Sequence, residues 1–265
     1  MGTQRSVPPH TIRERAEIVR SDVEAAHTST ATIKVGPRRL RRYSNPSAET
    51  NYPLEYAFHL IGDIRGRTVL DLGCGTGVTA VLLASKGARV IAVDISTSLL
   101  DIGRTRAVAS GIASPNFLAG SAHDLPIASA SIELVVGIAI LHHLDLDTVS
   151  REIHRVLRRG GRAIFQEPVR NSKWVERLRT VVPYQADDVS PFERPLTDAE
   201  LENFARRFVV RRQRAFSLPH INLWSVLPIL KRHPHKMHVI DGALLRRFSR
   251  LERLAGVRVF EIEKA

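Results

Sequence analysis

The stretch VLDLGCGTG, residues Val69–Gly77, decides the fold of this chain of 265 residues. Its apolar first half is typical of a buried strand, and its three glycines at alternate positions open a segment of helical period over 78–85. Glycines in such a turn let the backbone come close to a ligand. The stretch therefore predicts the first strand, turn and helix of a parallel α/β sheet, with a ligand site where the strand ends.

The same alternation of strands and helices continues along the chain. Apolar runs predict further strands over 89–94, 116–119, 133–138 and 162–166, and helical periodicity predicts helices over 98–109 and 147–157. Gly160 and Gly161 predict a tight turn into the fifth strand. A capped helix over 197–207 and two alternating runs, 208–214 and 257–262, predict the last elements of a doubly wound sheet.

The first fifty-one residues predict a helical extension and a linker, separate from the domain over 52–265. Thr11-Ile-Arg-Glu14 forms a capping box, and the apolar residues that follow fall on one helical face, which predicts a short amphipathic helix. These residues are Ile12, Ala16, Val19 and Val23. The basic stretch 36–51, rich in Pro and Ser, predicts a loop or linker before a second helix over 53–61.

Two inserts interrupt the rhythm of the main domain, one over 169–195 and one over 217–254. They carry Trp174, Tyr184 and Trp224, and more apolar residues than a solvent-exposed connection tolerates. Because the first insert leaves the edge where parallel strands end, we predict that both inserts form a cap over that edge and, with the N-terminal helices, choose the substrate. The alternative is that they bury a dimer interface, so the chain is predicted to be a monomer or a homodimer.

Composition favours an ordinary globular protein and weakens the case for a polyanionic partner. The contents of 43% hydrophobic and 25% charged residues are typical of folded domains. A net charge of +12 by itself suggests nucleic acid or an acidic membrane surface. Only six of the 39 basic residues are lysines, however, a skew that genomic base composition produces without selection for binding. We therefore expect no specific nucleic-acid partner.

The cellular compartment is predicted from the cysteine count and from the apolar runs. Cys74 is the only cysteine, so the chain forms no internal disulfide, and a reducing cytoplasm fits. No apolar run reaches the ~18 residues that span a bilayer, and the first residues lack the apolar core of a signal peptide. The sequence predicts a cytoplasmic protein without a membrane span.

The polar residues that follow the first three strands predict the chemistry of the ligand. Asp71 directly precedes the glycine turn, where a carboxylate repels a pyrophosphate but suits a cation such as the aminoacyl sulfonium of S-adenosylmethionine. Asp94 ends the second strand and offers two oxygens to a ribose diol. The run GSAHDLP, Gly120–Pro126, follows the third strand where backbone groups meet an adenine edge. Together they favour S-adenosylmethionine over a dinucleotide.

Five motifs resemble those of the class I S-adenosylmethionine-dependent methyltransferases, namely LDLGCGTG, VIAVDIS, GSAHDLP, AILHHL and EIHRVLRRGGRAIF. The resemblance spans residues 69–166, and YPLEYAFHLIGDIRG, from Tyr52, resembles the lead-in of a bacterial small-molecule subgroup. It implies a Rossmann-like, seven-stranded sheet that is mostly parallel with an antiparallel edge strand. N-terminal helices and a C-terminal helical cap complete the expected fold.

The resemblance also implies which residues bind the cofactor S-adenosylmethionine. Gly73 and Gly75 are expected near its methionine moiety, Asp94 on its ribose, and Ala122 and His123 beside its adenine. The full predicted set is Asp71, Gly73, Gly75, Gly77, Asp94, Ile95, Ala122, His123 and Ile138. The sequence departs from the family at Ser121, where many members carry an acid at the contact to the adenine amino group.

Two residues are predicted to be catalytic, and each has a structural alternative. His143, after the fourth strand, is placed to take a proton from a hydroxyl or an amine, while the alternative is that the pair His142 and His143 serves packing. Glu167, after the fifth strand, is placed to orient a substrate or His143. Its alternative is to anchor the following insert, with Arg170 as one partner.

These observations predict an S-adenosylmethionine-dependent methyltransferase that acts on an oxygen, nitrogen or carbon atom of a small molecule, in secondary metabolism for example. The alternatives are an RNA-directed methyltransferase, motivated by the charge of +12, and a cofactor-binding scaffold without turnover. No metal site is predicted, because His233, His235 and His238 lack a carboxylate or cysteine at a useful spacing.

Overall fold

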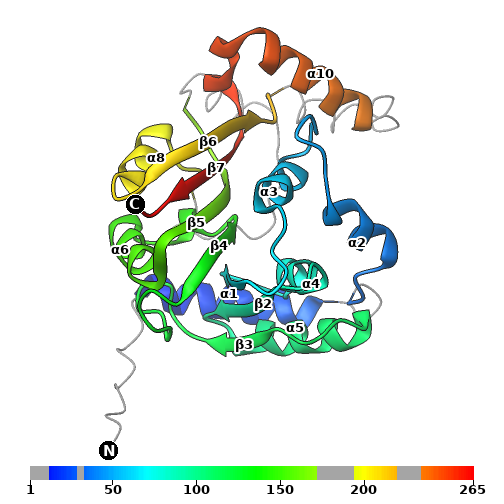
Figure 1. Ribbon diagram of the computed structural model, residues 1–265, viewed down its shortest axis with the longest axis vertical. Helices are drawn as coiled ribbons and strands as arrows, with labels where there is room; N and C mark the ends of the chain where they lie inside the picture. The colour runs from blue at the N-terminus through cyan, green and yellow to red at the C-terminus, as the bar shows by residue number, and fades with distance from the viewer. Residues whose placement is uncertain (1–11, 29–32, 172–193, 220–233) are drawn as a thin grey trace, which may run out of the picture.

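A computed structural model describes residues 12–28, 33–171, 194–219 and 234–265. One seven-stranded sheet, in the order β3-β2-β1-β4-β5-β7-β6, forms the centre of the molecule (Figure 1). The strands are β1 (Thr68–Leu72), β2 (Arg89–Asp94), β3 (Asn116–Ala119), β4 (Ile132–Ile138), β5 (Leu157–Pro168), β6 (Val209–Phe216) and β7 (Val257–Glu263).

Helices precede, connect and follow these strands. The α-helices are α1 (Ile12–His27), α2 (Pro37–Ser44), α3 (Pro53–Ile61), α4 (Val78–Ser85), α5 (Thr97–Ser110), α6 (Leu146–Val156), α8 (Asp198–Ala205) and α10 (Pro234–Arg247). Two short 3-10 helices are η2 (Leu141–His143) and η3 (Ser249–Leu254).

The pairing of the strands confirms the predicted fold class. β3, β2, β1, β4 and β5 are mutually parallel, and β7 pairs antiparallel to β5 and to the edge strand β6. The antiparallel pair β7 and β6 therefore ends a mostly parallel, Rossmann-like sheet. Because the five parallel strands share one direction, their carboxyl ends meet along one edge, where ligands bind in folds of this kind.

Alternate residues of each strand enter two separate apolar layers. Val69 belongs to the layer with α2, α3, α4 and α5, whereas Leu70 and Leu72 belong to the layer with α6 and α8. The first layer is centred on Phe58 and the second on Phe165, and both of these side chains are fully buried. This two-faced burial explains the apolar runs within the central strands β1, β2 and β4.

Two local predictions differ from the structure. The expected linker over 36–51 contains α2, because Pro37 occupies the first turn of that helix, where proline is tolerated, and Tyr43 packs on Phe58 with ring centroids 5.0 Å apart. The expected glycine turn before the fifth strand lies inside β5. Between Leu157 and Arg162 the pairing with β4 shifts register, so the glycines form a bulge within the strand.

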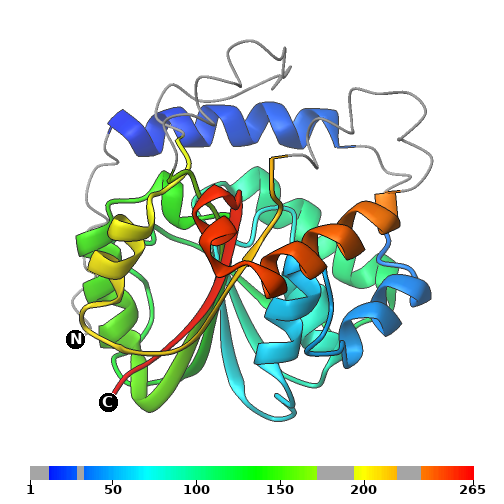
Figure 2. The ribbon, with the colours of Figure 1, turned by 90° about the horizontal axis from the view of Figure 1, so that it is seen from above.

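Helix α1 lies across the edge of the sheet with its polar side facing inward. Figure 2 shows it, in blue, running over the ends of the strands. Glu14, Glu17 and Ser21 are buried, whereas Ile12 and Val19 are 81% and 66% exposed. The predicted amphipathic helix therefore exists, but the face that it buries is the polar one.

The second predicted insert is described only in part. Asp241 of α10 accepts hydrogen bonds from the backbone N–H groups of Ser217 and Leu218, 2.9 and 2.7 Å away, which ties α10 to the end of β6. Segments 172–193 and 220–233, with Trp174, Tyr184 and Trp224, lie outside the described residues. The cap and the dimer interface both stay predictions.

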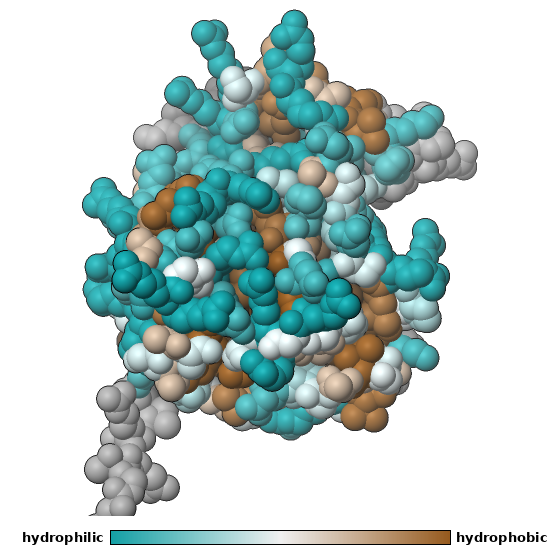
Figure 3. All heavy atoms as spheres, viewed as in Figure 1, coloured by the Kyte–Doolittle hydropathy of each residue, from teal (hydrophilic) through white to brown (hydrophobic). Residues whose placement is uncertain are grey.

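The face of the molecule in Figure 3 is mostly hydrophilic, with apolar side chains in separate small patches. Among the helices of the described residues, none is long and apolar enough to cross a bilayer.

Candidate functional site

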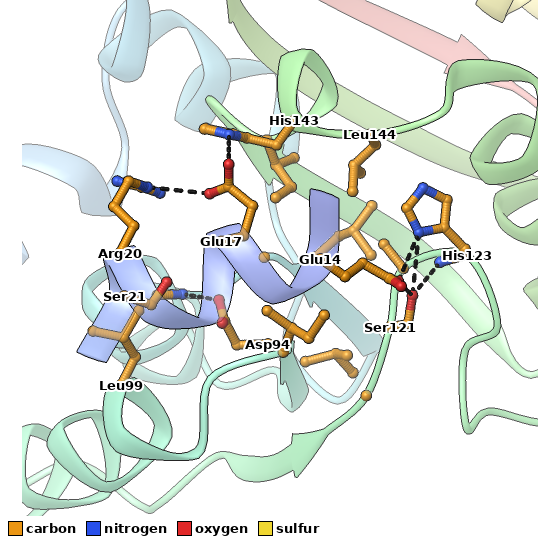
Figure 4. A pocket seen from close by; sticks show the side chains of 18 of the residues that line it. Glu14, Glu17, Arg20, Ser21, Asp94, Leu99, Ser121, His123, His143 and Leu144 are labelled. Carbon is orange, nitrogen blue, oxygen red and sulfur yellow. Dashed lines mark hydrogen bonds and ion pairs between the residues drawn. The ribbon is translucent and has the colours of Figure 1, made fainter. Parts of the chain in front are cut away.

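A cavity lies between α1 and the ends of β1, β2, β3 and β4 (Figure 4). Seven of the predicted site residues line it: Gly73, Gly75, Asp94, Ile95, Ala122, His123 and His143. The remaining four, Asp71, Gly77, Ile138 and Glu167, are not among the residues that line it. The structure thus brings most of the predicted cofactor residues to one place, the ligand-binding edge of the sheet.

Gly75 and Gly77 serve different purposes in the turn after β1. At Gly75, where φ is +50°, an added Cβ meets no protein atom within 4 Å, so a side chain would point into the cavity. At Gly77, where φ is +75°, the added Cβ would lie 2.7 Å from the Cα of Gly103 in α5. Gly77 therefore permits close packing of α4 on α5, while Gly75 keeps the floor of the cavity open.

Asp94 projects into the cavity and is held by the backbone. Its Oδ2 accepts a hydrogen bond from the Gly75 N–H (2.7 Å), and its Oδ1 accepts one from the Ser96 N–H (3.0 Å). Burial raises the pKa of this carboxyl, while these backbone donors lower it. Each oxygen keeps acceptor capacity, so the fixed carboxylate suits the two hydroxyls of a ribose.

Asp71 lies behind the glycine turn instead of in the cavity. It is 1% exposed, and its Oδ2 is buried without a hydrogen-bond partner. Burial, followed by the charge of Asp94, raises the pKa of Asp71 to about 8. The predicted contact of Asp71 with the cofactor stays a prediction. In the structure, the Asp71 side chain is buried behind the glycine turn.

This raised pKa predicts how stability depends on pH. An unfolded aspartate titrates near ~3.9, so between about pH 4 and 8 the folded protein keeps a proton that the unfolded chain has lost. The free energy of unfolding therefore falls as the pH rises through this window. We expect Asp71→Asn, whose amide cannot ionise, to lose less stability than the wild type between about pH 5 and pH 8.5 in thermal unfolding.

An exposed aspartate gives the matched control for this measurement. Asp101 of α5 has a side chain that is 76% exposed, so Asp101→Asn should follow the wild-type profile. Parallel profiles for Asp71→Asn and the wild type would contradict a raised pKa at Asp71.

The loop after β3 is tied to α1 by a small polar network. The Oγ of Ser121 accepts a hydrogen bond from the His123 N–H (3.1 Å) and donates one to Oε1 of Glu14 (2.5 Å). The Nε2 of His123 accepts from the Asp145 N–H (3.0 Å), so its proton sits on Nδ1, which donates to the same Glu14 oxygen (3.1 Å). Two donors therefore fix the Glu14 carboxylate inside the cavity.

His143 lines the cavity and faces a second glutamate of α1. Its Nδ1 lies 3.3 Å from Oε1 of Glu17, and the Arg20 Nε donates to Oε2 of that carboxylate (3.1 Å). Burial lowers the pKa of His143 to about 4, with a further contribution from His142. The imidazole is therefore neutral at physiological pH and able to accept a proton.

Glu167 holds the turn after β4 together from outside the cavity. It is fully buried, and its Oε1 accepts hydrogen bonds from the Ile140 and Leu141 N–H groups, 2.9 and 2.8 Å away. Its Oε2 lies 2.9 Å from Nδ1 of His142. Glu167 thus anchors η2, the turn that carries His143, and contacts the neighbouring histidine. Its catalytic role stays a prediction.

The cavity is acidic although the chain carries a net charge of +12. Among the described residues, four carboxylates line it, from Glu14, Glu17, Glu24 and Asp94, against one guanidinium, that of Arg20. Such a lining favours a cationic ligand and disfavours a polyanionic one. Together with the open floor at Gly75, it fits S-adenosylmethionine, which carries a sulfonium and an ammonium group.

α1 contributes five polar residues to this lining, and none of them is among the predicted site residues: Glu14, Glu17, Arg20, Ser21 and Glu24. The sequence pattern assigns Glu14 to a capping box, and the apolar stripe of the helix predicts burial of the opposite face. The available signal was the spacing of polar residues at 14, 17, 21 and 24, which places them on one helical face. Within the described residues, no group of three or more His, Cys, Asp or Glu side chains is arranged to hold a metal ion.

Comparison with known protein sequences places the chain among methyltransferases. A family model described as "Methyltransferase domain" matches residues 70–165. The chain is 39% identical over 103 residues to the ubiquinone/menaquinone biosynthesis C-methyltransferase UbiE of Rubrivivax gelatinosus, which covers 38% of this chain and 39% of that protein. It is 31% identical over 161 residues to the ubiquinone biosynthesis O-methyltransferase of Paracidovorax citrulli, which covers 55% of this chain and 67% of that protein.

Comparison with solved structures shows the same fold over nearly the whole chain. The geranyl diphosphate C-methyltransferase of Streptomyces coelicolor A3(2), in complex with Mg2+, geranyl diphosphate and S-adenosyl-L-homocysteine, superposes with a TM-score of 0.61 at 15% sequence identity. The superposition covers 97% of this chain and all of the other. Motifs, sheet order, cavity and relatives agree, and the chain belongs to the class I S-adenosylmethionine-dependent methyltransferase family, whose members use S-adenosylmethionine as their cofactor.

Proposed function

We propose that this chain transfers a methyl group from S-adenosylmethionine to an oxygen, nitrogen or carbon atom of a small molecule. The observation that carries the proposal is the acidic cavity at the edge of the sheet, closed over by α1. S-adenosylmethionine supplies an activated methyl group on a sulfonium. The task that remains for the protein is to align the acceptor atom and to handle its proton.

His143 is the residue that we propose for the proton transfer. It lines the cavity, and burial keeps its imidazole neutral. Glu17, 3.3 Å from Nδ1, stabilises the positive charge that His143 gains when it takes a proton from a hydroxyl or amine. In this scheme Glu17 is a positioning residue, carried by the helix α1 that covers the cavity.

The cavity argues against the alternative of a nucleic-acid substrate. A basic groove leading to the methyl donor would favour phosphates, whereas four of the lining side chains are acidic. The substrate is therefore proposed to be a small molecule.

The single buried Cys74 is consistent with a reducing compartment such as the cytoplasm.

Calorimetry followed by a turnover assay tests the proposal. We expect S-adenosylmethionine and S-adenosylhomocysteine to bind and NAD to show no heat of binding. A panel of phenols, amines and prenyl compounds is then screened for formation of S-adenosylhomocysteine above the rate without acceptor. Binding of NAD alone would overturn the proposal, and binding without turnover on a wide panel would favour the scaffold.

A further inference from the structure

We propose that Glu14 of α1 recognises the adenine of the cofactor, by accepting a hydrogen bond from its exocyclic amino group. This inference rests on the proposed function, because it assumes that the cavity holds S-adenosylmethionine. It assigns part of the cofactor specificity to the N-terminal helix instead of to the loops of the sheet.

The order of the strands decides where the adenine lies. The ends of β3, β2 and β1 stand side by side, and the cavity is lined in turn by Ser121, Asp94 and Gly75 from these three ends. With the ribose on Asp94 and the methionine part at the glycine turn, the base extends toward the end of β3. Ala122 and His123 line the cavity there.

A carboxylate stands at this end of the cavity, and it comes from α1. Figure 4 shows Glu14 reaching from the helix to Ser121 and His123, whereas Glu17 reaches to His143 at another part of the site. Glu14 is only 9% exposed, and both hydrogen bonds from the β3 loop go to its Oε1. The carboxylate is therefore held at a fixed place next to the expected base.

The chemistry of the two groups matches in one way only. A carboxylate accepts hydrogen bonds and donates none, and the amino group is the hydrogen-bond donor of the adenine ring system. A purine with an oxygen at that position presents an acceptor, which a carboxylate repels. Ser121 by itself, with one hydroxyl already donated to Glu14, does not make this distinction.

The experiment compares two ligands that differ at this position. S-adenosylhomocysteine and S-inosylhomocysteine, in which an oxygen replaces the amino group, are titrated into the full-length protein by calorimetry. We expect the wild type to prefer the adenine compound by at least roughly tenfold. Glu14→Gln should lose most of this preference, because its amide accepts from an amino group and also donates to an oxygen.

A matched control removes a negative charge from the same helix outside the cavity. Asp22 of α1 is exposed, and its Oδ1 accepts a hydrogen bond from the Ser98 Oγ (2.8 Å). Asp22→Asn should keep the wild-type preference for the adenine compound. Equal binding of both ligands by the wild type, or an undiminished preference in Glu14→Gln, would overturn the inference while leaving the proposed function intact. If the wild type binds neither ligand, the proposed function fails and the inference fails with it.

A second variant covers the case in which Glu14→Gln no longer binds either ligand. Ser121→Ala removes one of the two donors that fix the carboxylate and leaves Glu14 itself in place. We expect Ser121→Ala to bind S-adenosylhomocysteine. Its preference for the adenine compound over the inosine compound should be smaller than that of the wild type but still measurable. A full wild-type preference in Ser121→Ala, combined with loss of all binding in Glu14→Gln, would also overturn the inference.

Discussion

The variant Gly75→Val is expected to weaken the binding of S-adenosylmethionine by at least about 100-fold, equivalent to about 2.7 kcal/mol. The added side chain meets no protein atom within 4 Å of its Cβ and so enters the cavity. The methionine part of the cofactor is proposed to lie there. Calorimetry with S-adenosylhomocysteine measures the effect directly.

A second glycine separates this steric effect from strain in the backbone. Valine at φ +50° is strained wherever it stands, at a cost of roughly 1–2 kcal/mol. Gly111, at the end of α5, has φ +66°, has equally open surroundings and does not line the cavity. Gly111→Val should therefore lose a similar amount of thermal stability and keep its affinity. Full affinity in Gly75→Val would contradict the assignment of the cavity to the cofactor.

The part of the fold that the sequence predicts well is the part with local signals. β2 and β3 have the predicted bounds, because short apolar runs bounded by glycine and polar residues determine strands locally. Gly75 and Asp94 can be predicted as site residues from the sequence alone, because the motif shows both the residue type and its position at the end of a strand. Both residues line the cavity. Such features need no knowledge of distant contacts.

The particular side chains that α1 contributes to the cavity depend on distant contacts and could not be predicted in this way. The apolar stripe through Ile12 and Val19 favours burial of that face, yet the structure exposes it. The partners of Glu14 and Glu17 are Ser121 and His143, more than a hundred residues further along the chain. Periodicity predicts that a helix has two faces, but only the tertiary partners decide which face is buried.

Glu167 illustrates the same limit for a single residue. Its place after the fifth strand predicts a side chain at the ligand edge, and the structure puts it there but turns it toward the backbone of η2. The sequence offered two partners for Glu167: Arg170, three residues further along the chain, and His143, in the turn after the fourth strand. The observed partner is His142, because the turn after β4 brings this histidine toward the end of β5.

This arrangement predicts a large loss of stability in Glu167→Ala. The variant leaves the buried N–H group of Leu141, the partly buried N–H group of Ile140 and the ring of His142 without their acceptor. Each unsatisfied buried group costs about 1–3 kcal/mol, so we expect a loss of about 3 kcal/mol or more. For a chain of this size, that corresponds to a decrease of roughly 6–12 °C in the midpoint of thermal unfolding.

Two comparison variants separate this structural anchor from a general effect of losing a carboxylate. Glu133 of β4 accepts one backbone N–H, from Thr68 (2.8 Å), and its side chain is 18% exposed, so Glu133→Ala should cost about 1 kcal/mol. Glu167→Gln keeps a carbonyl oxygen for the backbone of η2 and should recover part of the stability lost in Glu167→Ala. If Glu167→Ala were no less stable than Glu133→Ala, the anchor would be wrong. The carboxylate would then be better explained as a group kept for the substrate.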